Sequence, residues 1–157
     1  MRRIVTKLVV GMAITVIGVF AADSSAATWK FNGAKSKTTS ANPIQSQTDL
    51  RETTPDGGVS VTRTGQFKDG TPNEGRYSYK YDGKESSAAA TGLPFDKISV
   101  KRKDASTTSW EAKKTGGRYH QTGQNVISKD GKMLTQSFKG IDTDGKPVKG
   151  TNVFDRQ

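Results

Sequence analysis

The sequence of 157 residues contains no cysteine and only one histidine, His120. The lack of cysteine excludes disulfide bonds, thiol catalysis and thiolate metal sites. With a single imidazole, any metal site would depend almost entirely on carboxylates. We therefore expect no metal, no cofactor and no catalytic residues, and we expect the protein not to be an enzyme.

Long apolar runs are also scarce, since the chain has only one, Leu8–Phe20, interrupted by Thr15 and two glycines. At about 13 residues this run is shorter than the roughly 20 that span a bilayer core. Basic residues precede the run and small residues follow it. This order predicts a cleavable signal peptide over residues 1–27, and a protein exported to the periplasm or out of the cell. No stable membrane anchor is then expected after cleavage.

Two positions fit cleavage by a signal peptidase, which needs small side chains just before the cut. Ser25 and Ala27 have the right spacing for a cut before Thr28. Val19 and Ala21 offer an earlier cut. We take the first of these as the boundary, so that 28–157 forms the mature protein as a single domain.

The predicted mature chain is strongly basic. Loss of Arg2, Arg3, Lys7 and Asp23 leaves 22 basic and 14 acidic side chains, a net charge of +8. This charge favours anionic partners, such as an anionic component of the cell envelope. Because the lysines are spread along the chain rather than clustered, a role in solubility is the stronger interpretation.

Apolar residues are few. They make up 31% of the full chain and about a quarter of the predicted mature chain, which is low for a packed domain. Either part of the chain is disordered, or the interior is partly polar and wet, as in a barrel that holds a ligand.

Turn signals, by contrast, are abundant and evenly spaced. The dipeptide Asp-Gly, which favours tight hairpin turns because its residues tolerate positive φ, occurs five times, at positions 56, 69, 82, 130 and 144. Further breakers stand near positions 93, 104 and 117. Turns about a dozen residues apart indicate a series of short antiparallel strands.

The segments between these turns alternate in the manner of half-buried strands. We expect strands over 29–33, 44–54, 59–67, 76–81, 84–91, 96–102, 107–114, 118–128, 132–141 and 147–155. The segment Gly33–Pro43 is expected to be a loop. The fold class is therefore all-β: an antiparallel up-and-down meander that closes into a lipocalin-like barrel of about 8–10 strands, because closure removes the exposed edges. A two-sheet sandwich is the alternative.

Tyr77, Tyr79 and Tyr81 form an aromatic stripe on one face of a predicted strand, with Lys80 on the other face. Three interpretations are open: packing in the core, lining a ligand cavity, or stacking on single-stranded nucleic acid. Core packing is favoured and nucleic acid is least favoured. Trp110 and Phe138 join the three tyrosines as candidate ligand-lining residues.

Two further patterns have simple structural explanations. A Ser-His-Asp hydrolase site would have to use His120, but no nucleophile-elbow motif is present, and a strand histidine beside Gly116-Gly117 is the favoured interpretation. Asp142-x-Asp144-Gly145 resembles the start of a calcium loop. The later ligand positions hold Pro147 and Val153, so a turn is expected.

The exported start, the first strand Thr28-Trp29-Lys30-Phe31-Asn32 and the closing hairpins through Asp130-Gly131-Lys132 and Asp144-Gly145-Lys146 resemble a group of small bacterial secreted lipocalin-like proteins, mostly without an assigned function. More distantly, the meander resembles the lipocalin and fatty-acid-binding superfamily. The lipocalin resemblance implies that Trp29 packs against a basic residue near the end of the chain, here Arg156. The Arg-x-Tyr pair and the helical lid of the cytosolic fatty-acid-binding proteins are absent, which argues against a fatty acid specifically.

These observations together predict a non-enzymatic exported barrel that binds or carries a small apolar or amphipathic ligand. The alternative is a solid barrel that acts as a cell-envelope interaction module through its basic surface.

Overall fold

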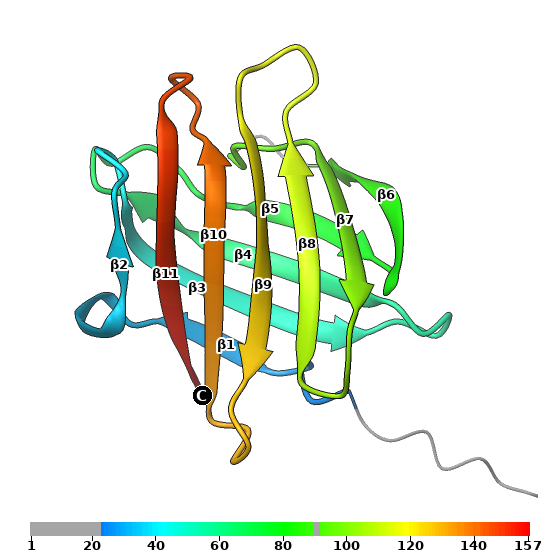
Figure 1. Ribbon diagram of the computed structural model, residues 1–157. Helices are drawn as coiled ribbons and strands as arrows, with labels where there is room; N and C mark the ends of the chain where they lie inside the picture. Colours follow the sequence, from blue (N-terminus) through cyan, green and yellow to red (C-terminus); the bar gives the residue numbers. More distant parts are fainter. Residues whose placement is uncertain (1–22, 90–91) are drawn as a thin grey trace, which may run out of the picture.

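The computed structural model describes residues 23–89 and 92–157 (Figure 1). Its elements in chain order are β1 (Thr28–Phe31), the 3-10 helix η1 (Gly33–Lys35), β2 (Lys37–Thr38), β3 (Ile44–Thr53), β4 (Val59–Phe67), β5 (Gly75–Tyr79), β6 (Asp82–Ala89), β7 (Lys97–Arg102), β8 (Thr107–Lys113), β9 (His120–Ile127), β10 (Met133–Ile141) and β11 (Pro147–Arg156). The predicted apolar run Leu8–Phe20 lies outside the described residues. Within these residues, no helix has the length and apolar character needed to cross a membrane.

The strands form one closed antiparallel barrel. From β3 to β11 each strand pairs with the next along the chain, and β1 closes the sheet by pairing with both β3 and β11. The short β2 pairs with Gly150 and Thr151 of β11, in the part of that strand that β1 does not reach. In Figure 1, β7 to β11 form one face, and β1, β3, β4 and β5 cross steeply behind it. The predicted closed meander is confirmed, with ten strands in the ring, and the sandwich alternative is wrong.

Four of the five Asp-Gly dipeptides form turns between strands as predicted, and the fifth, Asp82-Gly83, begins β6. Their glycines, Gly57, Gly70, Gly83, Gly131 and Gly145, have φ values between 70° and 84°, a region that residues with a Cβ rarely adopt. These turns set the hairpin registers, and the observed strands start and end within two residues of the predicted ones.

The segment Gly33–Pro43 is more structured than the expected loop. The Asn32 side chain accepts a hydrogen bond from the Lys35 amide, which caps η1. The Ser36 hydroxyl then donates to the Asn32 carbonyl and accepts from the Val153 amide, which ties the segment to β11. Polar composition misled the prediction here, because these side chains satisfy backbone groups rather than face solvent.

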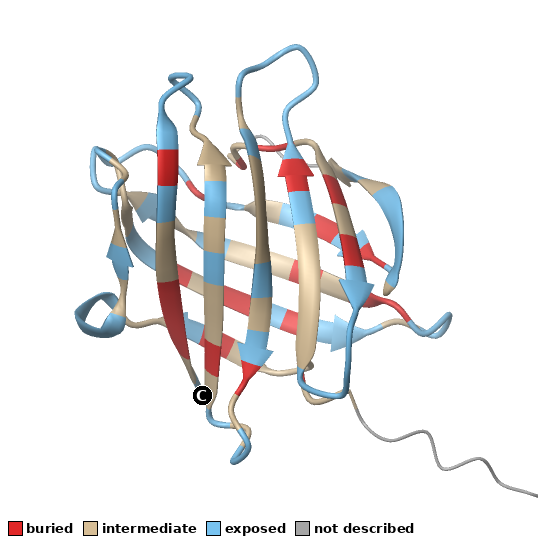
Figure 2. Cartoon of the chain, in the orientation of Figure 1, coloured by how far each residue is buried: buried red, intermediate tan, exposed pale blue. Residues whose placement is uncertain are grey.

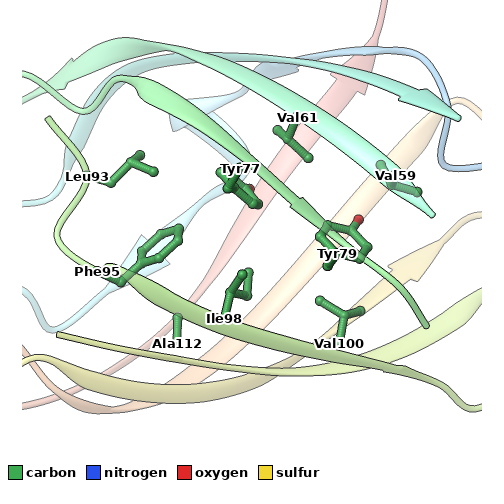
Figure 3. Close-up of a cluster of buried hydrophobic side chains, with 9 residues drawn as sticks. All are labelled: Val59, Val61, Tyr77, Tyr79, Leu93, Phe95, Ile98, Val100 and Ala112. Atoms are coloured by element: carbon green, nitrogen blue, oxygen red, sulfur yellow. The ribbon is translucent and has the colours of Figure 1, made fainter. Parts of the chain in front are cut away.

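The apolar core divides into two clusters. The larger one lies between β4–β5 and β7–β8, where Tyr77 and Tyr79 face Ile98 and Val100 across the interior (Figure 3). The smaller one, Trp29, Ile127, Leu134 and Phe154, lies at the end of the barrel that carries the β9–β10 turn. Figure 2 shows buried positions alternating with less buried ones along β4 and β7, as expected when one face of the sheet points inward.

Trp29 is fully buried and lies opposite Arg156 in the β1–β11 pairing. The Arg156 guanidinium carbon is 5.8 Å from the centre of the Trp29 ring, within range of a cation–π contact. The packing of Trp29 against Arg156, which the lipocalin resemblance implies, is therefore confirmed.

Candidate ligand-binding cavity

The barrel contains a cavity of about 570 Å³. It reaches from the middle of the strands to one end, where it is bordered by the segments 40–43, 69–73, 92–95 and 142–144. The solid barrel of the alternative hypothesis is therefore not what the chain forms. The volume lies in the range of small-molecule sites in proteins.

Four of the five predicted ligand-lining residues, Tyr77, Tyr79, Trp110 and Phe138, border this cavity. Tyr77 and Tyr79 are also members of the larger core cluster, so core packing and cavity lining both apply to them. Tyr81 lies outside the cavity, at the opposite end of the barrel, where its hydroxyl bonds to Asp23 and Ser25.

Two glycines make room for the aromatic rings on the β8–β11 side. Gly123 lies opposite both Trp110 and Phe138 in the strand pairing, and a Cβ there would come within 2.7 Å of the Trp110 ring. Gly150 is the other neighbour of Phe138, and a Cβ there would come within 2.8 Å of its ring. The rings thus lie against bare backbone, and they border both the cavity and a groove on the outer surface.

The opposite wall is polar, because β3 has its polar face inward. Along this strand Gln47, Asp49 and Arg51 are buried, whereas Leu50 is 42% exposed. Asp49 lies directly opposite Arg63 on β4, and the Asp49 side chain is completely inaccessible to solvent.

Asp49 is the centre of a buried hydrogen-bond network. Arg63 donates from Nε to Oδ1 at 2.8 Å and from Nη2 to Oδ2 at 3.0 Å, a two-point geometry that makes a strong pair. Gln47 Nε2 donates to Oδ1 at 3.0 Å, and Asn73 Nδ2 donates in turn to Gln47 Oε1 at 2.9 Å. Arg63 Nη2 also donates to the Tyr77 hydroxyl at 3.2 Å, which connects the polar wall to the aromatic one.

Arg51 is the second guanidinium at this carboxylate and is held less well. Its Nη2 lies 3.5 Å from Asp49 Oδ2, and its side chain is 5% exposed. Within the described part of the chain, Arg51 Nε has no hydrogen-bond partner, and neither do Asn73 Oδ1 and Trp110 Nε1. All three atoms belong to residues that border the cavity. Two arginines around one aspartate leave this cluster with a net charge of +1.

The surroundings of Asp49 favour its ionised form. Burial alone would raise the pKa of its carboxyl, but the charge and hydrogen bonds of Arg63, together with the charge of Arg51, lower it below its ordinary value of 3.8. Burial would lower the pKa of Arg63, but the Asp49 charge raises it above its ordinary value. All three groups are therefore charged at neutral pH.

The sequence did not identify this charged wall, although a signal for it was present. Val59 and Val61 are the inward residues of β4, and the turn at Asp56-Gly57 pairs Thr53 with Val59. Counting back along the hairpin places Arg51 opposite Val61 and Asp49 opposite Arg63, with all four side chains on the inner face. The pattern of β3 alone predicts the opposite orientation, in which the apolar Leu50 faces inward and Asp49 faces outward.

The tyrosine hydroxyls should resist ionisation in the folded protein. Burial raises the pKa of Tyr77 to about 12, against the charge of Arg63, and burial also raises the pKa values of Tyr79, Tyr81 and Tyr119. We expect an ultraviolet titration at pH 10, where a free tyrosine is half ionised, to show almost no tyrosinate. A titration midpoint near pH 10 in the folded state would show that the rings are solvated. The neutral form is favoured by folding, so the resulting stabilisation is present below pH 10 and is lost as the pH rises toward about 12.

Of the two remaining sequence candidates, His120 lies away from the cavity and Asp142 borders its opening. His120 is on the outer face at the start of β9, about half exposed, and its Nε2 lies 2.6 Å from Glu111 Oε1. It is a strand histidine, as expected. Asp142 accepts hydrogen bonds from the amides of Asp144 and Lys146 and closes a turn, which confirms that prediction.

The tyrosine stripe cannot stack on nucleic acid in this conformation. Tyr77 and Tyr79 are each 7% exposed, so their ring faces are covered by other side chains. The basic residues Arg76 and Lys80 point outward on the same strand and its end, on the opposite face of the sheet. The rings and the charges therefore do not form one surface.

A shallow groove lies on the outer surface over β2 and β8 to β11. Three exposed lysines, Lys37, Lys139 and Lys149, border it. Lys139 and Lys149 are direct cross-strand partners, an arrangement that costs stability. Within the described residues, none of the three forms an ion pair with a carboxylate.

No protein-family model matches the sequence, and no curated protein matches it. Among solved structures, the wild-type fluorescent protein UnaG is similar, with a TM-score of 0.55, 12% identity, and coverage of 87% of this chain and 100% of that chain. An alanine variant of UnaG gives a TM-score of 0.56 at 12% identity, covering 87% of this chain and 99% of that one. A redesigned barrel, mFAP1, solved with DFHBI bound, gives a TM-score of 0.46 at 14% identity, covering 85% and 95%. The two UnaG structures share the fold of this chain, a ten-stranded closed barrel of the lipocalin and fatty-acid-binding type.

Proposed function

We propose that this protein is an exported, non-enzymatic barrel that binds a small amphipathic ligand with an acidic headgroup. The observation that carries the proposal is the cavity itself, which has an aromatic wall on one side and a buried cluster of net charge +1 on the other. Neither wall alone would define a ligand class. Together they fit a molecule with an apolar body and one negative charge.

The headgroup would bind at Arg51. A buried charge without a full set of partners is costly, whereas a charge-assisted hydrogen bond recovers much of that cost. Both oxygens of Asp49 accept hydrogen bonds from Arg63, whereas Arg51 Nε has no partner among the described residues. A carboxylate, sulfonate or phosphate monoester would neutralise the cluster and give Arg51 Nε an acceptor.

The apolar body would lie between the aromatic rings and point to the open end. Trp110, Phe138 and Phe95 border the cavity there. The segments at the opening carry the carboxylates of Asp69 and Asp142, which repel an anion. An acidic ligand is thus best placed with its charge deep in the barrel and its tail outward.

The chemistry of the polar wall supports binding rather than catalysis. Arginine keeps its proton in proteins, and the Asp49 carboxylate accepts hydrogen bonds on both oxygens while its pKa is lowered. Such groups hold a charge in place and do not exchange protons near neutral pH. Export is proposed from the leader-like sequence of residues 1–27.

The direct test is binding of a matched pair of probes to the purified protein: dansyl-aminoundecanoic acid and its methyl ester. The two differ only in charge, so we expect the acid to bind at least about 10-fold more tightly, the value of one charge-assisted contact. Native mass spectrometry of protein purified without denaturation gives the stoichiometry, expected to be one. Equal affinity for acid and ester would contradict the acidic headgroup, and binding of neither would contradict the cavity as a ligand site.

The outer lysine groove favours a second candidate function, binding of an anionic envelope component at the surface. The like-charged pair Lys139 and Lys149 raises the local positive potential. Salt separates the two functions, because exposed charges are screened near 0.15 M ionic strength, whereas buried ones are screened much less. Acid binding that persists at high salt belongs to the cavity, and binding that vanishes belongs to the surface.

A further inference from the structure

The five residues before β1 are an ordered part of the barrel. Asp23 accepts hydrogen bonds from the Tyr81 hydroxyl at 2.6 Å and from Arg102 Nη2 at 3.1 Å. Ser25 is buried, and its hydroxyl lies 2.8 Å from the Tyr81 hydroxyl. The segment Asp23–Ala27 is thus attached to Tyr81, between β5 and β6, and to Arg102 at the end of β7.

The same segment satisfies two buried groups of the barrel wall. The indole Nε1 of Trp29, a side chain with no exposed surface, donates to the Ser25 carbonyl at 2.8 Å. The Arg51 amide donates to the Ala27 carbonyl at 2.9 Å. If these carbonyls were removed, two buried donors would lose their partners, at a cost of about 1–3 kcal/mol each.

Asp23–Ala27 also covers the end of the barrel opposite the cavity opening. A small cavity of about 20 Å³ separates the segment from Arg51, Tyr79 and Leu134 on the inner wall. Without this segment, water would reach the cluster of Asp49, Arg51 and Arg63 from both ends of the barrel. In the part of the chain that the structure describes, residues 23–27 thus close this end of the barrel, and we call them its floor.

These contacts distinguish the two cleavage positions that the sequence allows. A cut after Ala27 would remove the floor, whereas a cut after Ala21 would retain all of it. We infer that the exported protein is processed after Ala21, so that Asp23–Ala27 stay in the mature chain as the floor of the barrel. This inference rests on export but is independent of any ligand.

The test is the N-terminal sequence and intact mass of the protein exported by a bacterial host expressing the full chain. We expect the mature chain to begin at Ala22. A matched pair of substitutions checks the site, since valine is too large for the position just before the cut: Ala21→Val should abolish this product, and Ala27→Val should leave it unchanged.

A mature chain that begins at Thr28 would overturn the inference, as would export without cleavage. Loss of cleavage in Ala27→Val, but not in Ala21→Val, would overturn it independently of the mass. Because processing is read before any ligand is added, these outcomes do not depend on whether the proposed ligand binds.

Discussion

Replacement of Asp49 with asparagine is expected to destabilise the barrel by about 3–5 kcal/mol, the usual cost of removing one partner of a buried ion pair. The size is nearly conserved, so the loss comes from charge. Arg63 would lose both of its ionic hydrogen bonds, and two buried guanidinium groups would then lie side by side without a counter-ion. Urea unfolding with a fixed slope measures the change.

The matched control is Asp56→Asn, because Asp56 also forms an ion pair, with Lys80 at 2.9 Å, but on the surface. Asparagine suits the same Asn-Gly turn, and an exposed pair contributes about 0–1 kcal/mol. Similar losses in the two variants would show that the Asp49 network is as well solvated as the surface pair.

The acid dependence of stability follows from the same carboxylate. The pKa of Asp49 is lowered in the folded state, so its stabilising contribution is present above pH 3.8 and is lost as the pH falls through the lowered value. The difference in unfolding free energy between the wild type and Asp49→Asn should therefore shrink below pH 3.8. A constant difference down to the acid limit would contradict the assignment.

Replacement of Arg51 with methionine should selectively remove binding of the acidic probe. Loss of a charge-assisted contact of about 1.5–3 kcal/mol corresponds to a loss of roughly 10- to 100-fold in affinity for the acid. Affinity for the methyl ester should change little, because methionine retains an apolar stem at the same place. Fluorescence titration of both probes measures the two effects.

Arg51→Met should also fold, which makes the experiment interpretable. Its removal leaves Asp49 and Arg63 as a neutral, doubly hydrogen-bonded pair. Arg76→Met is the control, since Arg76 is exposed on the outer face of β5 and the net charge changes equally. If both variants lose acid binding to the same extent, the effect is due to overall charge, and Arg51 is not the binding residue.

Local sequence was sufficient to predict most of the fold. Each Asp-Gly turn requires a positive φ that the following glycine adopts, and each turn sets the register of its hairpin. Where apolar residues alternate, as at Val59 and Val61 or Ile98 and Val100, the inward face is also set locally. The exceptions, η1 and β2, depend on contacts with β11, which is distant in sequence.

The candidate site was predictable only in its aromatic half. Trp110 and Phe138 lie in strands with clear alternation, so their inward direction follows from the sequence. Leu50 reverses that rule on β3, where it is exposed and Asp49 is buried. The local pattern predicts the wrong face there. The free energy gained by burying one leucine is smaller than the free energy gained when Asp49 pairs with the buried Arg63.

The sequence by itself determined an all-β meander, its turns, its ring closure and a thin apolar content typical of a wet interior. Only the tertiary structure decided which polar residues are inside and which end of the barrel is closed. Both depend on contacts between strands that the pattern of a single strand does not contain, Asp49 with Arg63 across a hairpin and Asp23 with Tyr81 across the barrel. The free energy of a buried charge depends on its partners, and these are brought together only when the strands and the N-terminal segment pack in the folded barrel.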